Sequence, residues 1–427
     1  MEFSELNLEE SVLSALDAMN FVECTPVQEH TIPVLLEGHD LIGVAQTGTG
    51  KTAAYLLPVL SKLCSGGYPE DAINCIIMSP TRELAIQIDR QMEAFSYFMP
   101  VSGVPVYGGN DGVRFEQEKK GLTLGADVVI ATPGRLLSHI SLGYVDLSRV
   151  SFFILDEADR MLDMGFYDDI LQVVKLLPKE RQTIMFSATM PEKIRQLAST
   201  ILNNPVEVKL AVSKPAEKII QAAYICYEPQ KLPIIRDLFS SQKPERVIIF
   251  ASSKLKVKEV TKALKKMKLN VGEMHSDLEQ SQREEILHEF RNGKVNVLVA
   301  TDIVARGIDI DDIRLVINYD VPHDSEDYVH RIGRTARANN DGCAITFVSE
   351  TEQGKFYQIE KFLDKTIYKL QVPEELGDTP EYTPCTGSKK NQKRGNRRNN
   401  NRNNYRNKNR KTASKNKQES VNKENKQ

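Results

Sequence analysis

The chain has 427 residues, of which 41% are hydrophobic and 27% are charged. This balance is ordinary for globular proteins and the length suffices for two or three domains, which excludes a disulfide-stapled mini-protein, a fibrous repeat and a wholly disordered chain. The net charge of −2 is unevenly divided, because residues 389–427 hold 15 Lys and Arg against two acids, whereas residues 1–388 hold 41 against 56. An acidic body with a basic end is typical of a protein that contacts a polyanion.

The cysteines and the apolar segments indicate the compartment. Six cysteines lie at least 11 residues apart, so the sequence has no CxxC pair to bind zinc or exchange disulfides. The N-terminal stretch is acidic and lacks the apolar core of a signal peptide, and no uncharged apolar run approaches the roughly 18 residues of a membrane span. We therefore expect reduced thiols, no membrane association and a cytoplasmic location.

Short β-branched runs alternate with helical patterns in two regions, which predicts parallel sheets with crossover helices. The strands expected in the first region are 41–45, 74–78, 127–131, 152–155 and 183–186. Those expected in the second are 247–251, 271–274, 295–300, 315–319 and 344–348. The chain breakers Asn204-Pro205 and Lys214-Pro215 lie between the two regions. The predicted fold is α/β, with domains at residues 1–207 and 221–371, each a mostly parallel sheet flanked by helices, and a linker at 208–220.

The C-terminal segment differs in composition from the rest. Periodicity ends near Val372, and after Ser388 the chain is dominated by Asn, Arg, Lys and Gln. Such a segment cannot bury enough apolar surface to offset its ordering entropy, so we predict that residues 372–427 form a disordered basic tail. Its charge predicts sequence-independent affinity for a polyanion through counterion release.

A phosphate-binding loop is indicated after the first predicted strand, where the sequence reads Ala45-Gln46-Thr47-Gly48-Thr49-Gly50-Lys51-Thr52. Glycines let backbone N–H groups converge on phosphates at a helix N-terminus, the lysine reaches the β and γ phosphates, and the threonine offers a hydroxyl to Mg²⁺. The strict pattern has Gly where Ala45 stands. The alternative is a glycine-rich turn with a chance Lys-Thr pair.

The predicted strand 151–155 ends in Asp156-Glu157-Ala158-Asp159. Carboxylates at the carboxyl end of such a strand face the same crevice as the phosphate loop. We therefore expect Asp156 to hold Mg²⁺ through its waters, and Glu157 to orient and deprotonate the attacking water. An acidic tetrad alone is also common at solvated helix starts. Because the Asn-Lys-x-Asp guanine motif is absent, the predicted chemistry is ATP hydrolysis.

Together these segments resemble the DEAD-box RNA helicases of superfamily 2, and in particular a bacterial type with a short basic tail, over about residues 3–347. The further matching segments are Thr25-Pro26-Val27-Gln28, Pro80-Thr81-Arg82-Glu83-Leu84-Ala85, Gly108-Gly109, Thr132-Pro133-Gly134-Arg135, Ser187-Ala188-Thr189, Gln280-Ser281-Gln282-Arg283, Thr301-Asp302, Ala305-Arg306-Gly307-Ile308-Asp309 and His330-Arg331-Ile332-Gly333-Arg334-Thr335-Ala336-Arg337. The resemblance implies two RecA-like domains, ATP and Mg²⁺ as cofactors, and single-stranded RNA and short duplexes as partners.

The resemblance also implies roles for single residues around the nucleotide. Gln28 is expected to read the adenine, with Phe3 stacking on the base and Thr25 supporting the loop. Asp309 is expected to accept the ribose hydroxyls. Without the family, Phe3 reads as a staple for the first helix and Gln28 as a surface residue.

Two arginines are expected to act across the domains. By resemblance, Arg334 and Arg337 are arginine fingers that reach the γ-phosphate. The spacing of Arg331, Arg334 and Arg337 predicts one face of a helix, for which a solvated basic face is the alternative. The residues expected to couple nucleotide state to RNA binding are Asp159, Ser187, Thr189 and His330.

The RNA path implied by the resemblance consists of Arg82, Gly109, Thr132, Arg135, Arg283 and Thr301. Guanidinium groups, hydroxyls and glycine amides suit contacts with phosphate and sugar, so binding is expected to be independent of base sequence. Two positions depart from the family pattern, since Ala336 and Asn20 stand where Gly is usual. Because Ala disfavours positive φ, the first could shift the placement of the fingers.

The predicted function is that of an ATP-dependent RNA helicase that hydrolyses ATP between its domains and locally unwinds short duplexes. One alternative is a superfamily 2 DNA-dependent ATPase, and another is an ATP-gated RNA clamp or chaperone. The Gln28 segment and the acidic tetrad argue against the first, and Glu157 with both fingers argues against the second. Partners in ribosome assembly or mRNA decay fit this function, and the sequence does not choose between them.

Overall fold

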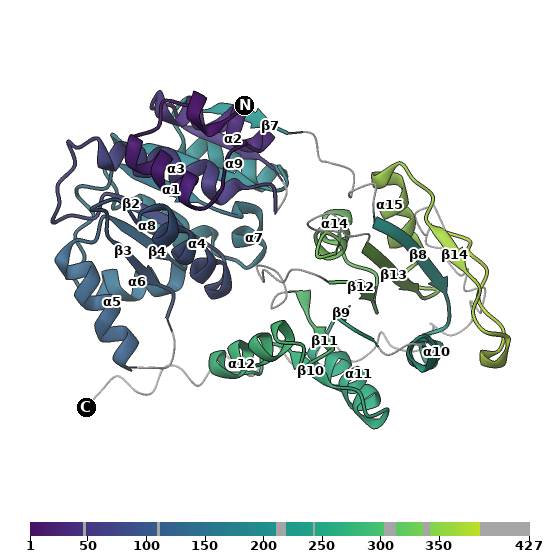
Figure 1. The fold of residues 1–427 in the computed structure, drawn as a ribbon. Coiled ribbons are helices and arrows are strands. Elements are labelled where there is room, and N and C mark those ends of the chain that lie inside the picture. The colour runs from purple at the N-terminus through teal and green to yellow at the C-terminus, as the bar shows by residue number, and fades with distance from the viewer. Residues whose placement is uncertain are drawn as a thin grey trace, which may run out of the picture. The chain divides into compact units, whose positions relative to one another are not determined.

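Two parallel sheets organise the chain in the computed structural model, which describes residues 1–45, 48–108, 112–210, 219–241, 244–302, 313–335 and 342–384. Each sheet has seven strands within these ranges, and helices accompany both sheets (Figure 1). Residues Met1–Pro384 form one compact unit that contains both sheets. Among the described helices, none combines the length and the apolarity that crossing a membrane requires.

The first sheet has the strand order β3-β4-β2-β5-β6-β1-β7. Its strands are β1 (Leu41–Val44), β2 (Cys75–Met78), β3 (Gly103–Val106), β4 (Val128–Ala131), β5 (Phe152–Leu155), β6 (Gln182–Ser187) and β7 (Val206–Lys209). Its helices are η1 (Phe3–Glu5), α1 (Glu10–Ala18), α2 (Pro26–Leu36), α3 (Lys51–Cys64), α4 (Arg82–Phe95), α5 (Gly112–Leu124), α6 (Pro133–Ser141), α7 (Ala158–Asp163), α8 (Tyr167–Val174) and α9 (Glu192–Ile201).

The second sheet has the strand order β10-β11-β9-β12-β13-β8-β14. Its strands are β8 (Ile219–Ile225), β9 (Val247–Phe250), β10 (Val271–Met274), β11 (Val297–Ala300), β12 (Leu315–Asn318), β13 (Gly342–Val348) and β14 (Tyr368–Leu370). Its helices are η2 (Glu228–Gln230), α10 (Lys231–Ser241), α11 (Lys254–Lys266), α12 (Gln280–Arg291), α14 (Ser325–Ile332), α15 (Gln353–Leu363) and η3 (Glu374–Leu376). Taken in chain order, these strands repeat the topology of the first sheet.

The strand order brings distant motifs together. In the first sheet β5, β6 and β1 are neighbours, and all pair in parallel. The phosphate loop follows β1, the acidic tetrad follows β5 and the Ser-Ala-Thr segment follows β6. Because parallel strands end at the same edge of a sheet, these three segments meet at one edge.

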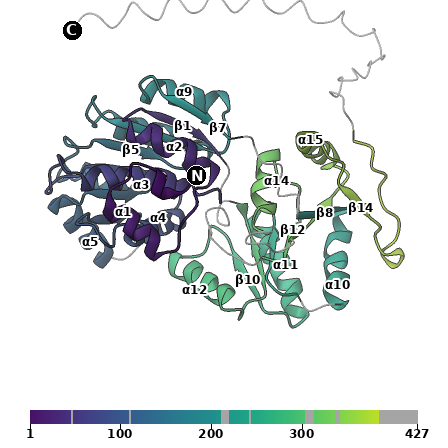
Figure 2. The same ribbon diagram turned by 45° about the horizontal axis from the view of Figure 1, so that its top comes forward.

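Each sheet is buried on both faces, as a parallel sheet requires. In β5, Phe152 and Ile154 join the core cluster that contains α1 to α4, whereas Phe153 and Leu155 join the cluster that contains α6 to α9. The second sheet is covered in the same way, by α12, α14 and α15 on one face and by α10 and α11 on the other (Figure 2). The predicted α/β fold class is confirmed.

Residues 372–384, which we predicted to belong to the tail, are bonded to the helices of the second sheet. The Gln230 amide donates to the carbonyls of Leu376 (2.8 Å) and Asp378 (3.0 Å). The Gln353 amide donates to the carbonyl of Glu381 (2.8 Å) and accepts from the backbone N–H of Thr383 (2.9 Å). The sequence pattern missed this stretch because side-chain amides and isolated apolar residues such as Leu376 and Tyr382 hold it, with no periodic apolar run. Residues 385–427 lie outside the described residues.

Candidate active site

The phosphate loop leads directly from β1 into α3. Gly48 and Gly50 have φ values of +83° and +92°, a left-handed conformation that glycine adopts without strain. Lys51 begins α3 and is 5% exposed, and its Nζ is buried with no hydrogen-bond partner among the described residues. A buried ammonium group without a partner is costly, so this position fits an anionic ligand such as a phosphate.

Asp156 and Glu157 lie beside the loop, at the end of β5. Asp156 accepts hydrogen bonds from the Tyr55 hydroxyl (3.0 Å) and from the backbone N–H of Glu157 (2.9 Å). Burial raises the pKa of Asp156 to about 6, against the lowering effect of the Lys51 charge. Tyr55 was not among the predicted site residues, because nothing in its sequence context distinguishes it from an ordinary buried residue of α3.

The pKa of Glu157 is shifted in the opposite direction to that of Asp156. Its backbone is left-handed, with φ at +53°, and its carboxylate is 3.2 Å from the Arg160 guanidinium. Burial raises the pKa of Glu157, but the charges of Arg160 and Lys51 outweigh it, and the pKa lies below its ordinary value. The pKa values of two adjacent carboxyl groups are thus shifted in opposite directions. In catalytic sites, such a difference allows neighbouring carboxyl groups to take different roles as acid, base or ligand.

The N-terminal end of α2 also contacts the loop. The Gln28 amide oxygen accepts from the Thr25 N–H (2.8 Å), and its amide nitrogen donates to the carbonyl of Gly50 (3.1 Å). Gln28 is therefore in contact with the phosphate loop, not a surface residue. Phe3 is 2% exposed and packs in the first core cluster, so no face of its ring is open to a base in this state.

Asp159 joins the acidic tetrad to the Ser-Ala-Thr segment. One oxygen of its carboxylate accepts from the backbone N–H groups of Ala188 (3.0 Å) and Thr189 (2.9 Å), and from the Thr189 hydroxyl (3.1 Å). The Ser187 hydroxyl donates to the carbonyl of Thr189 (2.7 Å). A movement of the acidic tetrad would therefore also move the Ser-Ala-Thr segment.

A cavity of about 490 Å³ lies over these residues. Residues of the first sheet that line it are Lys51, Glu157, Asp159, Arg160, Asp163, Ala188, Thr189, Met190 and Pro191, and those of the second are Asp324, Asp327, His330 and Arg334. His330 and Arg334 both contribute to lowering the pKa of Glu157. The structure thus brings predicted residues of both sheets to one cavity.

Arg331 differs from its neighbours. The prediction that Arg331 and Arg334 share a helix face is wrong, because α14 ends at Ile332. Arg331 is 3% exposed and makes a bidentate ion pair with Asp302 (2.6 and 2.7 Å). It also donates to the Asn318 side chain (3.2 Å), so it ties the ends of β11 and β12 together.

A second, larger cavity, of about 990 Å³, lies beside the predicted RNA-contact residues. The predicted residues that line it are Arg82, Thr132, Arg135 and Arg283, whereas Thr301, after β11, is not among the lining residues. Arg135 Nη2 and Arg283 Nε are buried and have no hydrogen-bond partner among the described residues. Unpaired guanidinium N–H groups in a cavity suit a ligand rich in acceptor oxygens.

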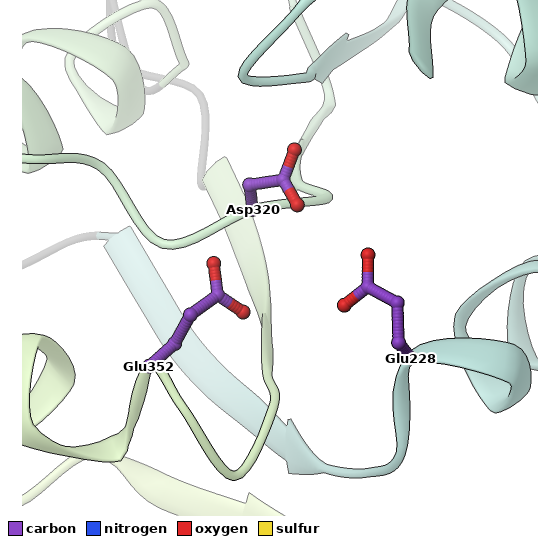
Figure 3. A group of neighbouring side chains, drawn as sticks. All are labelled: Glu228, Asp320 and Glu352. Atoms are coloured by element: carbon purple, nitrogen blue, oxygen red, sulfur yellow. The ribbon is translucent and has the colours of Figure 1, made fainter.

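Within the described residues, one group of carboxylates is close enough to hold a metal ion, and it lies away from these cavities. Figure 3 shows Glu228, Asp320 and Glu352 converging on a common space. The Lys231 ammonium lies 2.8 Å from Glu228, 3.3 Å from Asp320 and 3.1 Å from Glu352, and it is fully buried. The lysine supplies the positive charge there, so this cluster is an ion-pair network of the second sheet.

Comparison with known proteins identifies the family. Residues 25–197 match the DEAD/DEAH box helicase family, and residues 230–339 match the helicase conserved C-terminal domain. The ATP-dependent RNA helicase CshA of Listeria monocytogenes is 42% identical over 373 residues, which cover 87% of this chain and 71% of that protein. The chain belongs to the DEAD-box RNA helicases.

Further relatives support the same assignment of this DEAD-box helicase. The CshA protein of Geobacillus kaustophilus is 40% identical over 372 residues, which cover 87% of this chain and 78% of that protein. The structure resembles Saccharomyces cerevisiae Dbp5 bound to RNA and ADP BeF3, with a TM-score of 0.77, 31% identity, and coverage of 86% of this chain and 95% of that one. It also resembles Mss116p bound to ssRNA and AMP-PNP, with a TM-score of 0.78, 29% identity, and coverage of 88% and 80%.

Some predicted residues of the helicase lie outside the described residues. They are Gln46, Thr47, Gly109, Asp309 and Arg337, together with the departure Ala336. The other departure, Asn20, has a φ of +57°. Asparagine is among the few residues that adopt this conformation readily, so the turn usually made with glycine is preserved in the helicase.

The raised pKa of Asp156 predicts how nucleotide binding by the helicase depends on pH. Because its carboxylate is protonated below a pKa of about 6, affinity for Mg²⁺ and ATP should fall as the pH drops through that value. Excess Mg²⁺ stabilises the carboxylate and should move the fall to lower pH. ATP binding measured from about pH 5 to about pH 8 at two Mg²⁺ concentrations tests this. In Asp156→Asn only the titration of the nucleotide itself should persist, and an identical profile in both proteins would contradict the assignment.

Proposed function

We propose that this helicase binds single-stranded RNA without sequence preference, hydrolyses ATP between its two sheets and locally unwinds short RNA duplexes. The observation that carries the proposal is the cavity that Lys51 and Glu157 of the first sheet share with His330 and Arg334 of the second. A site assembled from two halves is complete only when they meet, so closure can link nucleotide binding to a change at the RNA path.

In the proposed mechanism, the loop and its flanking residues hold ATP. Gln46, Thr47, Gly48, Thr49 and Gly50 provide backbone donors, Lys51 binds the β and γ phosphates, and Thr52 and Asp156 would hold Mg²⁺, largely through water. When bound, Mg²⁺ neutralises charge on the phosphates. Glu157 orients and deprotonates the attacking water, and its lowered pKa keeps it ionised for this task.

The remaining nucleotide contacts follow the resemblance. Gln28 reads the adenine, with support from Thr25. Its hydrogen bond to Gly50 would link adenine binding to the conformation of the phosphate loop. Phe3 would have to expose its ring to stack on the base. Asp309 accepts the ribose hydroxyls, and Arg334 with Arg337 stabilises charge on the γ-phosphate.

Arginine and hydroxyl side chains form the proposed RNA path. The residues are Arg82, Gly109, Thr132, Arg135, Arg283 and Thr301, and four of them line the larger cavity. Contacts of this kind bind phosphate and sugar, which explains why no base preference is expected. The Asp159–Thr189 bonds, together with Ser187 and His330, would transmit closure of the ATP site to this path.

The proposal is tested by the polynucleotide that stimulates ATP hydrolysis. We expect single-stranded RNA to stimulate turnover and a DNA of the same sequence to do so weakly, and we expect a short RNA duplex to separate only when ATP is present. Equal stimulation by DNA would favour a DNA-dependent ATPase. Tight ATP-dependent RNA binding without turnover would favour the clamp.

The domain limits stay a prediction, with residues 1–207 and 221–371 as the two halves and 208–220 as the linker. A cytoplasmic helicase of this kind would meet its protein partners in ribosome assembly or mRNA decay. Sequencing of RNA crosslinked to a Glu157→Gln variant, which should retain bound RNA, would identify the process.

A further inference from the structure

A buried carboxylate that no motif includes lies behind the RNA-path arginine of α6. Glu118, on α5, is 2% exposed and accepts three hydrogen bonds. Its Oε2 accepts from Arg135 Nε (2.6 Å) and from His139 Nε2 (2.9 Å), and its Oε1 accepts from the backbone N–H of Gly108 (3.0 Å). One side chain therefore contacts residues of two separate segments of the proposed RNA path.

His139 and its neighbours hold this carboxylate in place. His139 is fully buried, its Nδ1 is hydrogen-bonded to the Tyr144 hydroxyl, and its ring stacks on Phe115 with centroids 4.5 Å apart. A neutral imidazole with its proton on Nε2 satisfies both bonds, because it donates to Glu118 and accepts from Tyr144. Glu118 is thus fixed in part by an imidazole whose two nitrogens are both hydrogen-bonded.

Arg135 is held on three sides. Its Nε is bonded to Glu118, its guanidinium lies 4.6 Å from the Phe115 ring centre, and its aliphatic stem packs on Gly108. A Cβ at Gly108 would lie 3.2 Å from Arg135 Cδ, and the φ of +76° there also favours glycine. The Nη2 group has no hydrogen-bond partner among the described residues, although it is buried, and Arg135 lines the larger cavity.

We propose that Glu118 is a positioning residue for RNA binding, which acts by fixing the Arg135 guanidinium and the Gly108 turn. The inference rests on the proposed RNA path. A guanidinium group held at Nε presents its Nη groups in one orientation, so less side-chain entropy is lost when a phosphate binds. A carboxylate that served stability alone would have no reason to affect RNA affinity through Arg135.

Four variants test this positioning role. Glu118→Gln keeps the shape of the side chain but removes its charge and one acceptor oxygen. Glu116→Gln removes a charge from an exposed position of the same helix and is the matched control. Arg135→Ala and the double variant Glu118→Gln/Arg135→Ala complete a double-mutant cycle. The readouts are the RNA concentration for half-maximal ATPase stimulation, turnover at saturating RNA, the salt dependence of RNA binding and the melting temperature.

We expect Glu118→Gln to raise the half-stimulating RNA concentration about tenfold, with turnover at saturating RNA within about twofold of wild type. The slope of log affinity against log salt should become shallower by about 0.7, the loss of one single-strand phosphate contact, as in Arg135→Ala. The double variant should be no weaker than Arg135→Ala alone.

Two results would overturn the inference without touching the proposed function. They are RNA affinity in Glu118→Gln equal to that of Glu116→Gln, and effects of Glu118→Gln and Arg135→Ala that multiply in the double variant. If Arg135→Ala itself leaves RNA affinity unchanged, the proposed RNA path fails instead.

Discussion

Replacement of Glu157 by glutamine is expected to lower ATP turnover at least about 10²-fold while ATP still binds. Glutamine keeps the size of the side chain and leaves Asp156 and Lys51 in place, but it cannot accept a proton from water. The charges of Arg160 and Lys51 lower the pKa of Glu157, which favours its ionised form. Steady-state hydrolysis at saturating RNA and equilibrium binding of a fluorescent ATP analogue measure the two effects.

Two comparisons control this variant. Glu157 pairs with Arg160, so the melting temperature of the variant must be compared with that of wild type. Glu180→Gln, at an exposed position, removes an equal charge away from the cavity and should leave turnover unchanged. Turnover near the wild-type rate in Glu157→Gln would show that another group activates the water.

Replacement of Arg334 by alanine should lower RNA-stimulated hydrolysis about 10³-fold, the effect expected for loss of an arginine finger. Arg334 is 6% exposed, lines the cavity that holds Lys51 and Glu157, and contributes to the lowered pKa of Glu157. Because it follows α14 in the second sheet's half, it can reach the γ-phosphate only when the halves are together. ATP affinity in the absence of RNA should therefore change little.

Two other arginines provide the contrast. Arg331→Ala would break the buried pair with Asp302, and we expect it to cost stability, on the order of 3 to 5 kcal/mol, seen as a lower melting temperature. Arg236→Ala, at an exposed position of α10, should alter neither stability nor turnover. If Arg334→Ala loses nucleotide binding and keeps its turnover, the finger assignment fails.

The sequence predicted most of the strands that are buried on both faces. All ten expected strands are present, because continuous apolar runs such as Phe152–Leu155 can be satisfied only inside a sheet. The strands β3, β7, β8 and β14 were missed. The side chains of β3, β7 and β14 are largely exposed or half-buried, and β7 lies within the breaker-rich stretch that suggested a boundary, so neither composition nor periodicity marks them. The side chains of β8 are mostly buried, but this strand begins inside the stretch 208–220 that was predicted to be a linker.

The site was predictable where a motif carries its own chemistry. Lys51, Asp156 and Glu157 could be found because glycines and carboxylates follow strands that a parallel sheet must bring together. Tyr55 and Glu118 could not be found, because only packing brings their partners into contact with them. The partner of Tyr55 lies 101 residues away in the sequence, and the partners of Glu118 lie 10 or more residues away. The sequence pattern also did not predict where helices end, because α14 ends at Ile332, before Arg334.

If one closed state binds ATP and RNA together, the affinities of the two ligands are coupled, and this coupling can be measured directly. The affinity of a non-hydrolysable ATP analogue should be determined with and without single-stranded RNA, and RNA affinity with and without the analogue. We predict that each ligand tightens the other by the same factor, at least about tenfold, and that Arg334→Ala brings this factor close to one. Independent binding of the two ligands to the wild-type protein would contradict the account.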